Sequence, residues 1–558
     1  MRNAQLIPAD GEQGVVTFAL RVNEEVLPLH VPVYGLTVCK EVNRIPYAKV
    51  LIIDGDVATQ DFKMSNEKWF VPGNELEIFL GYLNGEFRVF KGIIVKQHIT
   101  IRKGASFLEI DCRDAAYRMT LRRQGRYFEN QTDSELATEL VEAYGLKAEI
   151  ADTTHRHADI VQYDCSDWDF LVARMECNGL LTISDDGVVR TVTPDFEQEP
   201  ALCLYHGATV LEFDGGLELR DQFEELVART WSPGQQAVVE LTAKEPQVKQ
   251  NGNLPGQQIA AANGNKPNIY RHGGHLQDGE LQAWADARLL KDRLSRTCGR
   301  IQIQGYNAVK PGQTVVLQGF GDRFNGLVFV AAVHHEYMDE GWLTEIEFGL
   351  SPKWFAEIVK MEAPRAAGML PAVSGLQIGL VTQIEQDPEG EHRVRVRLPV
   401  LDADAAGVWA RIATLDAGSG RGAFFRPEVN DEVIVGFIHD DPRDAVILGM
   451  LHSSEKAAPF TVTQENHEKG YVSREGIRIV FHEKDGSLTL QTPGGNKMVL
   501  SDKGKGLVLS DQNGNKIQLD DQGITLSSPK NILIDATGKA QLMAKSTTVI
   551  KGKPVNIN

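Results

Sequence analysis

The stretch that decides the architecture is "GNKMVLSDKGKGLVLSDQNGNKIQLDDQGITLSS", residues 495–528. It alternates apolar and polar residues, as strands with one buried face do, and it turns at Gly, Asn and Asp. The same pattern starts at Gly476, Gly495 and Gly514, a spacing of 19 residues. Each unit predicts two short strands, and a fixed repeat of this kind is typical of a β-solenoid or fibre.

The large apolar side chains of this repeat are aliphatic, and no aromatic residue follows Phe481. A ribbon of such strands cannot bury its apolar face alone, and its free edges invite pairing. We therefore expect several copies to wind round a common axis as an intertwined β-prism, with the three glycines at tight turns. The residues expected in the shared core are Ile477, Ile479, Met498, Leu500, Ile517, Leu519, Ile524 and Leu526.

A monomeric β-helix is the alternative interpretation of the same repeat. Solenoids of that kind usually have larger coils and capped ends. The repeat alone leaves this alternative open.

The remaining chain predicts a mainly β protein with a few helices. Strands dominate residues 1–360, which we expect to form β-barrel hub domains with helical insertions. Five short strands in 376–452 predict a small barrel of the OB type. Segments 361–375 and 453–475 are predicted linkers, and 476–558 is the predicted needle.

Three helices are predicted within the first 360 residues. Thr132 followed by Glu135 forms a capping-box pattern, and Gly145 is placed to end that helix. Ser166 is the expected cap of the second helix, and the third follows Asp278.

The charge distribution argues against a nucleic-acid partner. The chain has a formal charge of −18, whereas residues 476–558 hold 11 basic and 7 acidic residues, so the rest carries −22. Binding to phosphates needs a basic surface, which this body lacks. We also expect no stable membrane insertion, since no apolar run reaches 18 residues.

No sequence motif predicts catalysis, a cofactor or a metal. "HRH" at 155–157 and "HH" at 334–335 lack the further acids or cysteines that would complete a zinc set. Asp440, Asp441 and Asp444 surround a proline in an expected turn, and Asp185-Asp186-Gly187 is typical of a hairpin. The six scattered cysteines are expected to be reduced.

Several stretches carry a family resemblance. "GAFFRPEV" with "DEVIVGFIHDDPRDAVILGMLH" is similar to the OB segment of VgrG-type (valine-glycine repeat) spike proteins, and "SDWDFLVARMECNGL" resembles a helix of their hub. The run from "WADARL" to "LTEIEFGL" resembles the same hub. Two departures are Asn430, where the family often has Gly, and Leu451-His452 in place of Tyr-Asn.

The resemblance implies a homotrimeric spike of a contractile injection machine: a type VI secretion system, an extracellular phage-tail-like particle or a phage tail. The implied partners are an Hcp-like inner-tube protein, baseplate proteins, a PAAR-type tip protein and effectors. Because the start lacks a signal-peptide pattern, we expect synthesis in the cytoplasm and export with the machine.

The expected role is structural and non-enzymatic: the spike joins the inner tube to the tip and pierces the target envelope. Two alternatives remain at this stage. One is a spike with cell-wall-degrading activity in its hub, and the other is a monomeric β-solenoid adhesin.

Overall fold

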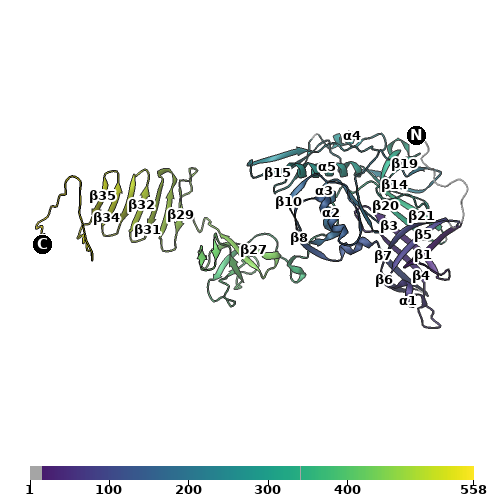
Figure 1. Ribbon diagram of the computed structural model, residues 1–558, viewed down its shortest axis with the longest axis horizontal. Helices are drawn as coiled ribbons and strands as arrows, with labels where there is room; N and C mark the ends of the chain where they lie inside the picture. Colours follow the sequence, from purple (N-terminus) through teal and green to yellow (C-terminus); the bar gives the residue numbers. More distant parts are fainter. Residues whose placement is uncertain (1–14, 84, 103, 265, 340, 558) are drawn as a thin grey trace. The chain divides into compact units, whose positions relative to one another are not determined.

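The computed structural model describes residues 15–83, 85–102, 104–264, 266–339 and 341–557 (Figure 1). Residues 1–14, on which the expectation about a signal peptide rests, lie outside this part. The chain divides into two compact units, Met1–Ala363 and Pro364–Asn558, which are described separately below. Over the described residues, every helix is too short or too polar to span a lipid bilayer.

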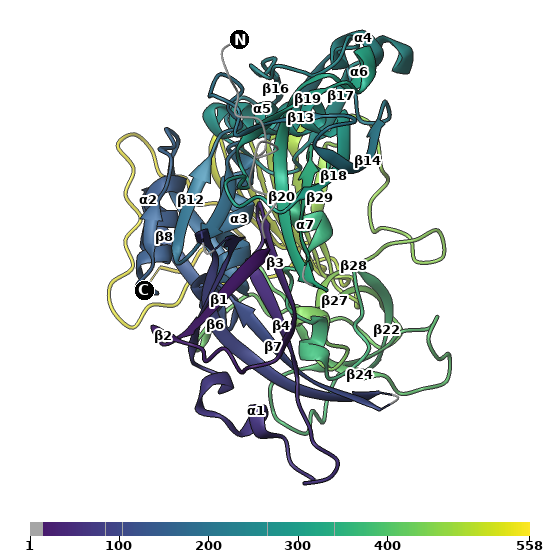
Figure 2. The ribbon, with the colours of Figure 1, turned by 90° about the vertical axis from the view of Figure 1, so that its right-hand side faces the viewer.

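A 13-stranded sheet dominates the first unit, and its central strands β3, β4 and β7 can be followed in Figures 1 and 2. Strand β19 (Thr314–Gln318) pairs with β20 and with β13 (Leu202–Tyr205) beside the main path. In order, the main path is β14 (Val210–Leu217), β18 (Thr297–Gln304), β21 (Gly341–Phe348), β20 (Gly326–Met338), β3 (Val33–Glu41), β4 (Tyr47–Ile53), β7 (Ala105–Arg113), β6 (Gly85–Arg102), β5 (Glu75–Tyr82), β1 (Val16–Val22) and β2 (Glu25–Val26).

Three smaller sheets complete the strands of this unit. One is an antiparallel pair, and the other two each combine one antiparallel and one parallel pairing. They are β8 (Arg123–Thr132) with β10 (Arg156–Ser166); β11 (Leu181–Asp185), β12 (Val188–Val192) and β9 (Lys147–Glu149); and β16 (Ala237–Thr242), β15 (Leu226–Ser232) and β17 (Asn268–Arg271).

The three predicted helices are confirmed as α2 (Asp133–Glu142), α3 (Asp167–Cys177) and α5 (Asp278–Ser295). Thr132 and Glu135 form the expected reciprocal capping box of α2. The hydroxyl of Ser166 accepts a hydrogen bond from the Asp169 amide at the start of α3. Shorter helices are α1 (Lys63–Asn66), α4 (Gly256–Ala260), α6 (Gly321–Phe324) and α7 (Phe355–Ile358).

The second unit begins with the predicted five-stranded barrel, which closes on itself. Its strands, in order round the barrel, are β22 (Gln377–Gln383), β23 (Val394–Arg397), β24 (Val408–Ile412), β28 (Ala445–Met450) and β27 (Glu432–Phe437). A two-stranded ribbon, β25 (Ala417–Gly418) and β26 (Arg421–Gly422), lies between β24 and β27 in the chain. The buried aliphatic side chains inside the barrel are Val381, Val394, Val396, Ala410, Val433, Val435, Ala445 and Ile447.

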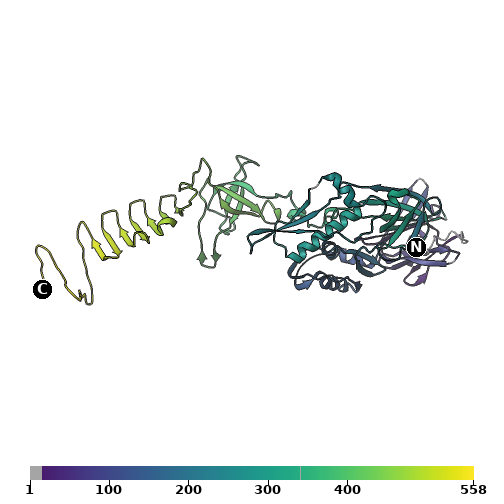
Figure 3. The same cartoon turned by 90° about the horizontal axis from the view of Figure 1, so that it is seen from above.

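Seven five-residue strands then form one antiparallel sheet, called here the C-terminal sheet and seen from above in Figure 3. Each strand pairs with the next in the chain, so this sheet is a meander and not the stacked coils of a solenoid. Its strands are β29 (Glu468–Val472), β30 (Arg478–His482), β31 (Ser487–Gln491), β32 (Lys497–Ser501), β33 (Gly506–Ser510), β34 (Lys516–Asp520) and β35 (Gly523–Ser527).

The sheet starts earlier than the sequence repeat, because β29 lies inside the predicted linker 453–475. This strand has little aliphatic alternation, so the pattern did not reveal it. Gly470 lets it approach β30: a Cβ there would lie 2.2 Å from the Ile479 carbonyl oxygen.

Candidate functional site

Two rows of apolar side chains run across one face of the C-terminal sheet, which we call the aliphatic face. The strand register places each member of a row directly opposite the next, so both rows are continuous. Side chains alternate between faces along each strand, which puts both rows on the same side. Row one is Ile479, Leu490, Met498, Leu509, Ile517 and Leu526; row two is Phe481, Leu488, Leu500, Leu507, Leu519 and Ile524.

All of the predicted core residues belong to this face. Row one contains Ile479, Met498, Ile517 and Leu526, and row two contains Leu500, Leu519 and Ile524. Ile477 immediately precedes β30 and continues the alternation of that strand.

The sequence-based set omitted five members of the two rows, although their alternation is the same. These are Leu488, Leu490, Leu507, Leu509 and the aromatic Phe481. The set took only the first strand from the repeats that start at Gly476 and Gly495. The second strands of those two repeats supply the four leucines.

The aliphatic face is open to solvent in the single chain. Leu500 is 39% exposed, Ile517 38% and Ile524 72%. No residue of β29–β35 is fully buried. Row one also borders a groove of about 610 Å³, whose apolar lining is Ile477, Ile479, Leu490, Met498, Leu509 and Ile517.

The opposite face of the sheet is more mixed in chemistry. Its central row is Val480, Thr489, Val499, Val508, Gln518 and Thr525. The row ends in the polar residues Gln518 in β34 and Thr525 in β35. Only the aliphatic face is therefore apolar along its whole length.

Turn chemistry fixes the register of the sheet. Gly476, Gly495 and Gly514 have φ angles of +84°, +97° and +87°, which L-residues with a Cβ rarely adopt. The Asp511 carboxylate accepts hydrogen bonds from the amides of Asn513 and Asn515 and from the Asn515 side chain, and these bonds lower the pKa of Asp511 to about 2. Each repeat thus carries its own turn.

Beyond β35, residues 528–557 contain neither helix nor strand. This segment nonetheless exposes large aliphatic side chains: Leu533 is 87% exposed and Leu542 79%. Its apolar surface therefore has no partner within the described chain.

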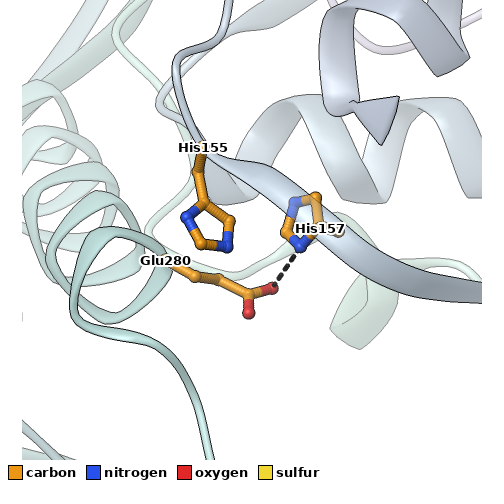
Figure 4. Close-up of side chains that lie close together, drawn as sticks. All are labelled: His155, His157 and Glu280. Carbon is orange, nitrogen blue, oxygen red and sulfur yellow. Dashed lines mark ion pairs between the residues drawn. The ribbon is translucent and has the colours of Figure 1, made fainter. Parts of the chain in front are cut away.

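The hub histidines at 155–157 have an acidic neighbour that the sequence did not indicate. Figure 4 shows His155 beside His157, with one ring nitrogen of each facing the carboxylate of Glu280. Glu280 lies in the first turn of α5, far from the histidines in the chain. Nothing in the local sequence pattern connects the two segments.

A buried polar network supports this cluster. The Asp133 carboxylate lies 3.1 Å from His157 Nε2 and accepts bonds of 2.7 and 3.1 Å from the Arg174 guanidinium. Asn178 donates to it at 2.9 Å. Although burial opposes ionisation, these hydrogen bonds hold the pKa of Asp133 well below its usual range.

The second histidine pair divides between two environments. His334 Nε2 lies 3.1 Å from the Glu347 carboxylate and near Cys39, and these contacts raise the pKa of His334. His335 is buried, and its Nδ1 lies 3.0 Å from the Thr344 hydroxyl. Burial lowers the pKa of His335 to about 3, so this ring is neutral.

The two acidic turns serve local structure. Asp441 lies in the expected turn, but its side chain is buried and pairs with the Arg443 guanidinium at 2.6 Å. Asp185 pairs with Lys40 and, at 2.7 Å, with Lys310. Although burial opposes it, the two lysines lower the pKa of Asp185 to about 2.

Three family models match the chain. Residues 12–339 match the Alg8 N-terminal domain, residues 377–452 the type VI secretion system/phage-baseplate injector OB domain, and residues 487–558 the phage baseplate V C-terminal trimerisation domain. The last two cover the closed barrel and most of the C-terminal sheet.

Solved structures of tail and secretion proteins are similar to the chain. A 43 kDa tail protein of prophage MuSo2 from Shewanella oneidensis is 12% identical, with 60% of this chain and 98% of that chain covered and a TM-score of 0.46. An E. coli component of the type VI secretion system is 14% identical, with 77% and 99% covered and a TM-score of 0.39. A Francisella PdpA–VgrG complex is 8% identical, with 92% and 88% covered and a TM-score of 0.38.

The barrel model, the trimerisation model and the order of the parts agree with the motifs in the sequence. Residues 12–339 are more than half of the chain, so the chain belongs to the family of the Alg8 N-terminal domain. It also carries the type VI secretion system/phage-baseplate injector OB domain and the phage baseplate V C-terminal trimerisation domain, in line with its resemblance to VgrG-type spike proteins.

Proposed function

We propose that three copies of this chain assemble through the aliphatic face into a closed β-prism, the needle of an injection spike. The observation that carries the proposal is the pair of continuous apolar rows left exposed on one face of the C-terminal sheet. Burying both rows against two further copies would remove this surface from water, a contribution of roughly 25 cal/mol per Å² of apolar area. The match to a trimerisation domain supports three as the number of copies.

The proposed action of the assembly is mechanical. Contraction of a sheath would drive tube and spike forward, and the needle would concentrate that force on a small area of the target envelope. A prism whose strands are all paired has no free edge along its length, which favours stiffness. In this proposal the spike itself is not an enzyme.

We infer the partners of each part from its place in a contractile injection machine. The hub would bind an Hcp-like inner tube and baseplate proteins, and the free end of the needle would bind a PAAR-type tip. The Francisella VgrG was solved with PdpA, which supports an effector-like partner for this chain too. We propose assembly in the cytoplasm, followed by release on contraction.

The native mass of the full-length chain tests the assembly. One chain is 61.7 kDa, so three times this mass is about 185 kDa. We expect light scattering to give the trimer mass and to keep it on dilution. A stable, folded monomer would overturn the shared needle.

A separate assay tests the absence of catalysis. Purified spike incubated with isolated cell envelopes should release no soluble fragments above a heat-treated sample. Release that scales with spike concentration would instead support a hydrolytic hub.

A further inference from the structure

We propose that His155, His157 and Glu280 form a binding site for a divalent transition metal of the zinc class in the hub. The candidate ligand atoms, one from each residue, all lie within 4.8 Å of one another. The proposal concerns the first unit alone and does not depend on trimer assembly.

The donor set fits this class of metal. Two imidazoles and one carboxylate occur as the protein ligands of open zinc sites, in which further positions are left to water or another ligand. Imidazole nitrogen favours zinc and its neighbours, whereas magnesium and calcium favour oxygen. A site of this composition should therefore discriminate strongly between zinc and the alkaline-earth ions.

The hydrogen bonds of His157 leave one nitrogen available for a metal. His157 Nε2 lies 3.1 Å from the Asp133 carboxylate and 3.2 Å from Arg174 Nη2, so both polar partners of the ring on this side contact the same nitrogen. Nδ1 is the nitrogen left for a metal, and it lies 3.9 Å from Glu280 Oε1 (Figure 4). A cation bound between this nitrogen and the Glu280 carboxylate would take a lone pair from each.

The surroundings hold the ligands in place. Carboxylates behind metal-binding histidines fix the tautomer and the ring orientation, and Asp133 has that position here. It is itself fixed by Arg174 and Asn178. Gly279 lets the helix approach His155, because a Cβ there would lie 3.0 Å from the His155 Nδ1.

Arg174 is the one competing cation in the cluster as described. Its Nη2 lies 3.2 Å from Glu280 Oε1. Arg174 also makes two hydrogen bonds to Asp133, so it keeps a charged partner when Glu280 turns to a metal. The second carboxylate oxygen of Glu280 offers a further ligand atom.

The test is calorimetric titration of Zn²⁺ into metal-stripped full-length protein. We expect one ion per chain, and at least a 10-fold weaker affinity in His155→Ala and in Glu280→Gln, since loss of even an outer partner costs about 10- to 100-fold. His272→Ala removes an exposed histidine of the same unit and is the matched control, with unchanged affinity expected. Mg²⁺ and Ca²⁺ should not displace the zinc.

Two safeguards keep the outcome decisive. His155 is half-buried and makes no hydrogen bond among the described residues, so His155→Ala should fold, and its circular dichroism and melting temperature check this. Absorption of the Co²⁺-loaded protein reports the ligand type independently. Equal zinc binding by wild type and His155→Ala, no zinc binding by wild type, or thiolate-to-cobalt charge-transfer bands would each overturn the site.

Discussion

The barrel and the C-terminal sheet are built from the same material and differ in how they bury it. Both use short strands with alternating aliphatic residues. In the barrel the first and last strands meet, and the inward side chains are buried, with Val381, Val394 and Ile447 at 0% exposure. In the C-terminal sheet the strands run on without closing, and Leu500 remains 39% exposed. The barrel meets the need to bury its apolar face within one chain, and the proposed trimer would meet the same need between chains.

The largest effect is expected from a substitution that disrupts the proposed trimer. Leu500→Asp would place three charges near one axis, and each unpaired buried charge costs several kcal/mol. We expect the trimer mass to fall to that of one chain in light scattering. Gln518→Asp, in the central row of the opposite face, is the control and should remain trimeric; a trimeric Leu500→Asp would contradict the proposed interface.

The next effect concerns closure within the chain. Ile447→Ala removes a fully buried side chain of the barrel and should cost about 2–5 kcal/mol. Hydrogen exchange followed by mass spectrometry should show faster exchange in peptides of β24, β27 and β28, equally at low and high protein concentration. Concentration-dependent protection would mean that the barrel, too, depends on assembly.

A third prediction concerns a buried acid in the first unit, where burial affects a charged group instead of an aliphatic one. Asp292 is fully buried in α5, 3.0 Å from the Arg288 Nε, and its oxygens accept no hydrogen bond among the described residues. Burial raises the pKa of Asp292 to about 7, above its unfolded value near 3.8. The protonated acid therefore favours folding below about pH 4, and this contribution is lost as pH rises through 7.

Asp292→Asn should remove that loss. We expect the variant to be more stable than wild type near pH 8, on the order of 1–3 kcal/mol, with little difference near pH 4. Melting of the hub across this range measures the effect. A difference that stays constant with pH would show that the carboxyl does not titrate there.

The smallest expected effect concerns one turn of the barrel. Asn430 has a φ angle of +72°, a conformation that Asn and Gly tolerate better than other residues. Asn430→Ala should destabilise the barrel by about 1 kcal/mol, and Asn430→Gly should be nearly neutral. Denaturant unfolding of the two variants gives the difference, and equal losses would remove the conformational explanation.

Sequence reasoning succeeded where the signal was local and periodic. The capping box at Thr132, the barrel strands and the aliphatic rows all follow from patterns within a few residues of each other. It failed where tertiary contact made the feature. Strand β29 lacks alternation, and Glu280 joins His155 and His157 only because the fold brings the first turn of α5 next to residues 155–157.

The 19-residue repeat also gives the C-terminal sheet a unit of length. Each repeat supplies two strands of the meander, and neighbouring strands lie about 4.8 Å apart. One added repeat would thus lengthen the sheet by about 10 Å without changing its width or its aliphatic face. Because every repeat brings its own turn glycine, inserting or deleting a whole unit would keep the register of the sheet, and the proposed needle would change in length while the barrel stayed the same.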